Sequence, residues 1–346
     1  MVRIGVIGYG YWGPNLVRNF GETAGAQVAC VSDLRHERLK LVQARYPAVQ
    51  VTTNHRDLID DPKIDAIAIA TPVSTHFDLC LSALQAGKHV FVEKPLAGTA
   101  EQVQRLVDAA QKANRVLMVD HTFVYTGAVQ KIRQLVDSGA LGDIYYYDST
   151  RVNLGLFQHD IDVIWDLAVH DLSIMDYVIP ERPVAVSATG LSHVVGGKEN
   201  IAFLTLFFGG PLIAHIHVNW LAPVKIRRTL IGASKQMIVY DDLDQSEKIK
   251  IYDKGITLDR KRDPAEKIYE VLVGYRTGDM LSPRLELKEA LAVEAAHFVR
   301  CITEREQPLS DGLAGLRVVQ ILEAASESMR RRGAPVELPV QASQRT

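Results

Sequence analysis

The sequence predicts an α/β protein with two parts: a parallel sheet wound with helices, then a C-terminal α/β domain with a large, open and mainly antiparallel sheet. Three observations lead to this fold class. A short apolar strand runs into a glycine-rich turn at Gly8, and strands and helices alternate along the first third of the chain. After residue 180, several strands follow one another without helices between them, which is typical of hairpins.

The first strand, Val2–Ile7, leads into the segment GYGYWG, in which each glycine has its own task. Gly8 allows a tight turn, Gly10 lets the backbone approach a pyrophosphate, and Gly13 lets the following helix pack close to its strand. The helix N-terminus then presents free N–H groups to the phosphates. This order of elements predicts an N-terminal Rossmann dinucleotide-binding domain.

The second strand, Gln27–Ser32, ends at Asp33, 20 residues after Gly13 (33 − 13 = 20). A carboxylate at this position can accept hydrogen bonds from both hydroxyls of an adenosine ribose, and it would repel a 2′-phosphate. The alternative is that Asp33 only caps the next helix. The spacing favours NAD as the cofactor, although Arg35 and Arg38 follow closely and leave NADP possible.

Composition excludes several classes of protein. The chain has 346 residues, of which 47% are hydrophobic and 23% charged, as is ordinary for a globular protein of about two domains. A net charge of −2 argues against binding to nucleic acid, and no apolar run reaches the length of a membrane span. The three cysteines form no CxxC motif, so we expect buried thiols in a cytoplasmic protein.

The alternation continues through the first domain, and every later strand there is short and apolar. We expect strands at Val49–Val51, Asp65–Ala70, His89–Val92 and Val116–Val119, with helices at 76–86 and around Val103–Ala110. The alternation ends after His121. The predicted domains are therefore residues 1–122 and 123–346.

The second domain begins with a helix, a strand and a second helix, and it continues with strands. We expect helices at 127–138, 165–178, 287–302 and 313–329, and strands at 144–152, 184–191, 201–208, 212–221 and 226–231. Along 212–221, apolar residues alternate with His215, His217 and Asn219, so one face of the sheet is core and the other half polar. Such a face could line a cleft or a subunit contact.

A lysine at the end of the fifth strand is the first candidate for chemistry. Glu93, Lys94 and Pro95 follow that strand at the carboxyl edge of the sheet, where open α/β sheets bind ligands. Lys94 could hydrogen-bond a substrate oxygen and stabilise a developing alkoxide. The alternative is a solvated surface lysine in a turn.

Asp166 and His170 form the second candidate. Residues four apart share the face of an α-helix, so the two side chains should project together. Histidine titrates near neutrality, as a general base for an alcohol should, and a carboxylate would orient it. A helix-face ion pair without chemistry remains an alternative, and a metal site is disfavoured because no further ligand cluster is present.

Together these motifs resemble the glucose–fructose oxidoreductase/inositol dehydrogenase (Gfo/Idh/MocA) family along essentially the whole chain. The resemblance rests on the glycine turn, Asp33, the segments ATP (70–72) and AGKHVFVEKP (86–95), and the spacing of Asp166 and His170. It implies NAD(P)-dependent oxidation or reduction of a sugar or cyclitol hydroxyl, with Lys94, Asp166 and His170 as the catalytic residues. It also implies a homo-oligomer, a dimer or tetramer, that assembles through the C-terminal sheet.

The remaining site residues are expected from their places in these motifs. The cofactor set is Gly8, Gly10, Tyr11, Trp12, Gly13, Asp33, Arg38, Thr71, Pro72, His76, Glu93 and Lys94. The substrate set is Lys94, Arg151, Asn153, Phe157, Gln158, Asp166 and His170, and no metal is expected. Arg151 could meet a diphosphate or carboxylate, or form an ion pair on an edge strand.

The segment RVNLGLFQ (151–158) and the motif WDLAVHD (165–171) resemble those of relatives that oxidise nucleotide-linked sugars, often at C3. A free sugar or inositol is the alternative substrate. A different class of function, a dinucleotide sensor without turnover, would need the glycine turn but not Lys94, Asp166 and His170.

Overall fold

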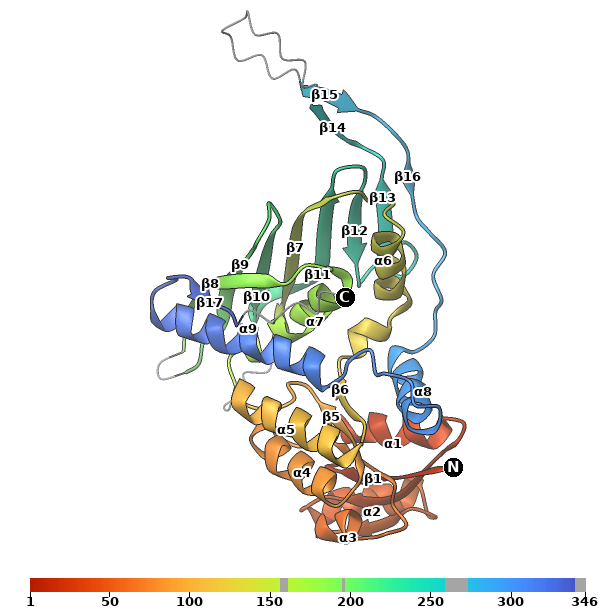
Figure 1. Ribbon diagram of the computed structural model, residues 1–346. Helices are drawn as coiled ribbons and strands as arrows, with labels where there is room; N and C mark the ends of the chain where they lie inside the picture. The colour runs from red at the N-terminus through yellow and green to blue at the C-terminus, as the bar shows by residue number, and fades with distance from the viewer. Residues whose placement is uncertain (156–160, 195–196, 259–272, 340–346) are drawn as a thin grey trace, which may run out of the picture. The chain divides into compact units, whose positions relative to one another are not determined.

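The computed structural model describes residues 1–155, 161–194, 197–258 and 273–339. Packing divides the chain into two compact units (Figure 1). Unit 1 consists of Met1–Val129, Leu172–Tyr177 and Leu287–Glu323, and unit 2 consists of the rest. This division is by packing and is not continuous along the chain, so the domain boundary at residue 122 stays a prediction.

Unit 1 contains a six-stranded parallel sheet in the order β3-β2-β1-β4-β5-β6, which confirms the predicted Rossmann-type sheet. Its strands are β1 Val2–Ile7, β2 Ala26–Ser32, β3 Gln50–Thr52, β4 Ala66–Ile69, β5 His89–Glu93 and β6 Leu117–Asp120. Its helices are α1 Gly13–Glu22, α2 His36–Arg45, α3 Arg56–Ile59, α4 Val73–Gln85, α5 Ala100–Ala113 and α8 Ala290–Thr303, with a 3-10 turn at Thr122–Tyr125. Because the strands are parallel, the turns after β1, β4, β5 and β6 meet at one edge of the sheet.

Three phenylalanines mark the centre of the unit 1 core. Phe20 on α1, Phe91 on β5 and Phe298 on α8 pack edge to face, with ring centroids 5.4–5.9 Å apart. All three side chains are fully buried. Helix α8 is therefore part of this core, although it lies almost 200 residues after β5 in the sequence.

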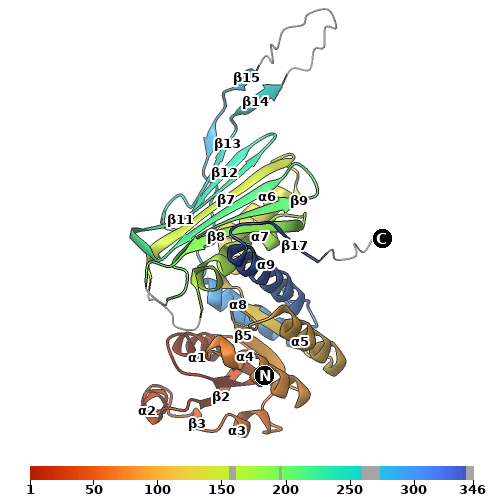
Figure 2. The same ribbon diagram turned by 90° about the vertical axis from the view of Figure 1, so that its left-hand side faces the viewer.

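Unit 2 is built on a nine-stranded mixed sheet in the order β16-β13-β12-β11-β7-β10-β9-β8-β17 (Figure 2). Only β7 and β10 pair in parallel, and the other pairs are antiparallel. Its strands are β7 Ile144–Leu154, β8 Pro183–Leu191, β9 Ile201–Phe208, β10 Ile213–Asn219, β11 Leu221–Ala233, β12 Met237–Asp241, β13 Ile249–Tyr252, β16 Met280–Leu281 and β17 Val336–Glu337. A separate hairpin pairs β14 Gly255–Leu258 with β15 Val273–Arg276.

The remaining helices are α6 Gly127–Asp137, α7 Val169–Val178 and α9 Gly312–Arg330. Helix α7 follows a π-helical turn, Ile164–Ala168, whereas the sequence predicted a continuous helix over 165–178. The predicted strands 212–221 and 226–231 also differ from the structure. Strand β10 ends at Asn219, and β11 is one long strand whose pairing with β7 shifts register between Leu221 and Ile226.

The predicted alternation along β10 is confirmed. Ala214, Ile216 and Val218 are fully buried, whereas His215 and His217 lie on the opposite, partly exposed face. The three cysteines are buried and unpaired. Among the described helices, none combines the length and the apolarity that a membrane span requires.

Candidate active site

Two of the three glycines in the turn after β1 are required by the protein's own packing. A Cβ at Gly8, whose φ is +97°, would lie 2.4 Å from the backbone oxygen of Ala70, and a Cβ at Gly13 would lie 2.2 Å from that of Gly8. At Gly10 the nearest atom is on the Arg35 side chain at 3.7 Å, so the protein leaves that side open. An open side at Gly10 fits the close approach of a pyrophosphate.

Asp33 keeps its negative charge at the end of β2. Its Oδ2 accepts a hydrogen bond from the Tyr9 backbone N–H at 2.7 Å, and its Oδ1 accepts from the Arg35 N–H at 2.9 Å and Nε at 3.2 Å. Burial acts to raise the pKa of Asp33, but the hydrogen bonds from Arg35 and Tyr9 outweigh it and hold the pKa below its ordinary value. An ionised carboxylate at this place suits the ribose hydroxyls of NAD and disfavours a 2′-phosphate.

His76 ties two of the turns at this edge together. The ring is fully buried on α4, with Nδ1 2.9 Å from the Pro95 carbonyl oxygen and Nε2 2.9 Å from that of Thr71. Burial lowers the pKa of His76, so the ring is neutral and donates to one carbonyl at a time. The turn after β4, with Thr71 and Pro72, is thereby held to the turn that carries Lys94.

Trp12 ties the glycine turn to the end of β6. Its Nε1 donates to Oδ2 of Asp120 at 2.8 Å, and the hydroxyl of Thr122 donates to the other oxygen of Asp120. The neighbouring Tyr11 is 90% exposed and makes no such tie. Arg38 lies in the first turn of α2 and is half-buried.

Three acidic side chains lie together beside this tie. Glu93 at the end of β5 and Glu294 on α8 both interact with Asp120, and Glu294 is fully buried. Burial raises the pKa of Glu93 and of Glu294 well above the ordinary value, and the nearby Asp120 raises both further. Burial and Asp120 thus favour the protonated forms of Glu93 and Glu294, and Lys94 is adjacent to the first of them.

In unit 2, Asp166 lies in the π-helical turn and His170 in the first turn of α7. The predicted i, i+4 relation assumed one regular α-helix, and the π turn replaces that geometry. Asp166 accepts a hydrogen bond at its Oδ2 from Nε1 of the buried Trp220 at 3.1 Å. Both Asp166 and His170 are half-buried, and π turns are frequent at functional sites.

Arg151 lies on β7, an internal strand rather than the expected edge strand, and its side chain is buried. Its Nε and a terminal nitrogen donate to the two oxygens of Asp171 at 2.7 and 3.2 Å. Ser149 donates to the same carboxylate at 2.7 Å. This ion pair fixes the residue next to His170, and it is the alternative that the sequence left open for Arg151.

Of the other expected substrate residues, the structure describes only Asn153. Asn153 is half-buried on β7, whereas Phe157 and Gln158 lie outside the described residues. On the open face of β10, the ring of His217 stacks on Phe203 at 4.4 Å, and His215 lies 3.5 Å from Asp148. The described residues contain no group of three or more His, Cys, Asp or Glu side chains arranged to hold a metal ion.

Comparison with known proteins identifies the family. The family model for an oxidoreductase family with an NAD-binding Rossmann fold matches residues 2–121, and the model for the GFO/IDH/MocA C-terminal domain matches residues 129–239. The chain belongs to the Gfo/Idh/MocA family. Unit 1 of this oxidoreductase therefore contains an NAD-binding Rossmann domain, as the glycine turn and Asp33 predicted.

Relatives of this Gfo/Idh/MocA protein act on different substrates. The oxidoreductase YdgJ of Escherichia coli is 30% identical over 72% of this chain and 74% of its own. UDP-N-acetylglucosamine 3-dehydrogenase of Acidithiobacillus ferrooxidans is 28% identical over 92% of this chain and 94% of its own, and its structure superposes with a TM-score of 0.79 over 95% of this chain and 97% of its own. Myo-inositol 2-dehydrogenase of Thermotoga maritima is 23% identical over 96% of this chain and 97% of its own.

Asp120 and Glu294 are not among the site residues predicted from the sequence. Asp120 is the last residue of β6, just as Glu93 is the last residue of β5. An acidic residue at the end of a second strand could therefore have been read from the sequence. Glu294 sits in the segment ALAVEAAHF, where a lone acid among apolar residues signals burial. Neither signal shows that the two acids meet, because 174 residues separate them (294 − 120 = 174).

Proposed function

We propose that this Gfo/Idh/MocA protein oxidises or reduces a hydroxyl or keto group of a nucleotide-linked sugar, at C3 of the sugar ring. The observation that supports this substrate class is the similarity to UDP-N-acetylglucosamine 3-dehydrogenase along nearly the full length of both chains. The cofactor is NAD, which when bound accepts or supplies the hydride. The charge on Asp33 and its pairing with Arg35 favour NAD over NADP.

His170 is the proposed general base. It removes the hydroxyl proton when the sugar is oxidised and returns a proton when the ketone is reduced. Lys94 hydrogen-bonds the reacting oxygen and stabilises negative charge that develops on it. Asp166 positions the sugar and orients His170, and the indole of Trp220 holds the Asp166 carboxylate in place.

Arg151 has a positioning role in this proposal. Its guanidinium holds Asp171, the residue after His170, and so fixes the first turn of α7. A buried charge pair leaves a strongly unfavourable isolated charge when one partner is removed. Asn153, Phe157 and Gln158 are proposed to contact the sugar or its nucleotide.

A free sugar or inositol is the second candidate substrate, and the relative that acts on myo-inositol supports it. The test is to follow the absorbance of the reduced nicotinamide while UDP-sugars, free sugars and inositols are each supplied with NAD. We expect kcat/KM for UDP-N-acetylglucosamine to exceed that for any inositol by about 100-fold or more, because the nucleotide adds binding contacts. An inositol that reacts equally well would contradict the proposed substrate.

The same screen separates an enzyme from a dinucleotide sensor. A sensor would bind NADH tightly and turn over none of these compounds, whereas the presence of Lys94, Asp166 and His170 supports turnover. A Lys94→Ala variant should lose far more turnover than NADH affinity. Equal losses of both would indicate a structural lysine.

We also propose that the protein forms a dimer or tetramer through the open face of the unit 2 sheet, in the cytoplasm. Phe203, Phe207, Ile213 and Ile226 are large apolar side chains on that face and are exposed in the single chain. An exposed apolar patch on a sheet is typical of a subunit contact. The buried, unpaired cysteines support a reducing compartment.

A further inference from the structure

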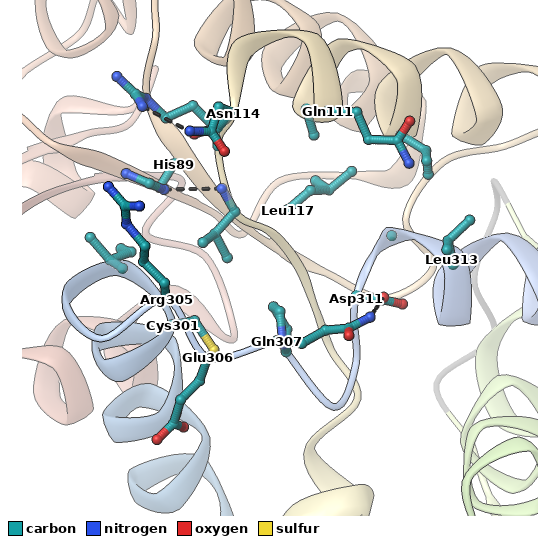
Figure 3. A pocket seen from close by; sticks show the side chains of 17 residues that line it. His89, Gln111, Asn114, Leu117, Cys301, Arg305, Glu306, Gln307, Asp311 and Leu313 are labelled. Carbon is teal, nitrogen blue, oxygen red and sulfur yellow. Dashed lines mark hydrogen bonds between the residues drawn. The ribbon is translucent and has the colours of Figure 1, made fainter.

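Unit 1 contains a cavity of about 510 Å³ at the edge of its sheet opposite the glycine turn (Figure 3). It lies where β5 and β6 begin, at His89 and Leu117, whereas the cofactor turns follow the ends of these parallel strands. Its other walls are the end of α5, the end of α8 and the segment that leads into α9. The cavity is therefore separate from the NAD site within the same unit.

The cavity has two guanidinium groups without a carboxylate partner in the described part of the chain. Arg115 donates only to the backbone oxygens of Gly87 and Asn114. Arg305 has no hydrogen bond or ion pair with any described residue, and it lines the cavity on the same side as Asn114 in Figure 3. Guanidinium groups with unused donors favour an anionic ligand.

The acidic side chains of the lining are already bound by other groups. Glu306 accepts a hydrogen bond from Arg300 at 3.2 Å and lies 3.6 Å from His297, and Figure 3 shows it leading away from Asn114. Asp311 caps α9 by accepting from the N–H of Ala314 at 2.8 Å, and its other oxygen accepts from Gln307 at 3.1 Å. Both carboxylates of the lining thus already accept hydrogen bonds, whereas the two arginines keep unused donors for a ligand.

The backbone at Arg305 adopts a conformation that is unfavourable for a residue with a side chain. Arg305 follows the end of α8 with a φ of +60°, in the left-handed region where glycine is favoured. A side chain there is unfavourable by roughly 1 kcal/mol relative to glycine. Residues kept in this conformation are frequent at ligand clamps, and here the conformation brings a guanidinium to the cavity.

The other lining residues indicate which groups the rest of the ligand should carry. Carboxamides of Gln111, Asn114 and Gln307 offer further hydrogen bonds, and apolar side chains cover the wall between the helices. These apolar residues are Val107, Ala110, Leu117, Ile302 and Leu313. A cavity of this size and mixture is typical of a small-molecule site.

We propose that this cavity is a second ligand site, which binds a small molecule carrying an oxyanion, a phosphate or a carboxylate, on an apolar body. Arg305 and Arg115 bind the oxyanion, and the apolar wall binds the body. The site takes its ligand while NAD occupies the opposite edge of the same sheet.

The test uses the full-length protein saturated with NAD, so that added anions cannot enter the dinucleotide site. Phenyl phosphate, benzoate and inorganic phosphate are titrated by calorimetry. We expect saturable binding of phenyl phosphate or benzoate with a Kd of about 1 mM or tighter, and weaker binding of inorganic phosphate, which lacks the apolar body. The stronger of the two organic probes identifies the oxyanion.

Arg305→Gly and Arg332→Gly form a matched pair of variants. Arg332 also has a positive φ, +56°, near the end of a helix, but it does not line the cavity. Both variants should be as stable as the parent or more stable, because glycine relieves the same backbone cost. Only Arg305→Gly should weaken probe binding, by about 10-fold or more.

A third variant, Arg305→Gln, keeps a side chain in the left-handed conformation and removes the charge. It should lose binding as Arg305→Gly does, which separates the charge from the backbone effect. The proposal is wrong if neither organic probe binds saturably, if Arg305→Gly binds as the parent does, or if Arg332→Gly loses binding to the same degree.

Discussion

Replacing Glu294 with glutamine should change how the stability of unit 1 depends on pH. Glu294 is fully buried beside Asp120, and burial, then Asp120, raise its pKa well above the ordinary value of 4.5. Between pH 4.5 and that raised pKa, the folded state holds a proton that the unfolded state has lost. Stability from this group is therefore lost as the pH rises through that interval.

The size of this pH dependence follows from the single proton that Glu294 holds in the folded state. Each pH unit in this interval lowers the free energy of unfolding by about 1.4 kcal/mol, and the profile is measured from pH 6.5 to 8. Glutamine has the same shape and no proton to lose. Glu294→Gln should therefore gain stability relative to the parent by about 1.4 kcal/mol for each pH unit within this interval, while Glu93 keeps its own pH dependence in both proteins.

The assay is urea unfolding at several pH values, read by hydrogen exchange of β5 and β6 so that unit 1 is followed by itself. Below pH 6.5 the buried histidines would add an opposite slope, which is why the range starts there. The control is Glu289→Gln at the start of the same helix. Hydrogen bonding from Arg18 lowers the pKa of Glu289, so its contribution is constant from pH 6.5 to 8. Parallel pH profiles for Glu294→Gln and the parent would refute the raised pKa of Glu294.

Four further predictions follow from the two units. His170→Ala should lower kcat by about 100-fold or more with little change in NADH affinity, and near-normal turnover would exclude His170 as the base. Trp12→Phe removes the hydrogen bond to Asp120 and should weaken NADH binding by roughly 2- to 10-fold in a fluorescence titration, with no effect if the glycine turn needs no tie. Burial raises the pKa of Asp162 to about 6, so Asp162→Asn should stabilise unit 2 by up to about 3 kcal/mol above pH 6 and not at pH 4, as urea midpoints would reveal. Ile213→Glu should shift the oligomer toward monomer in light scattering, and an unchanged mass would place the contact elsewhere.

The parallel sheet could be predicted because its evidence is local. Gly8 and Gly13 are confirmed as sterically required, and each short apolar strand lies within a few residues of its predicted place. The long strand β11 could not be predicted as one element. Pro223 lacks the N–H that a ladder needs, so the sequence indicated a break where the structure has a register shift.

Only those features of the candidate site that depend on a single short motif could be predicted from the sequence. The π turn at Ile164–Ala168 leaves no clear mark in composition, so the relation between Asp166 and His170 was expected on an α-helical geometry that the structure does not have. The role of Arg151 depends on Asp171, which lies 20 residues later in the chain and also accepts a hydrogen bond from Tyr147 at its carbonyl oxygen. Long-range pairs of this kind have no signal in a single sequence.

Hydrogen bonds between turns hold the carboxyl edge of the unit 1 sheet together. His76 joins the turns after β4 and β5, and Trp12 with Asp120 joins the turns after β1 and β6. The four turns are thus joined in two pairs by side chains of the protein itself. Turns that are fixed before a ligand binds lose less conformational entropy on binding, so we expect these hydrogen bonds to raise the affinity for NAD. For Lys94, which stands in one of the linked turns, the same ties restrict where its ammonium group can reach, and a catalytic lysine needs that restriction more than a solvated one.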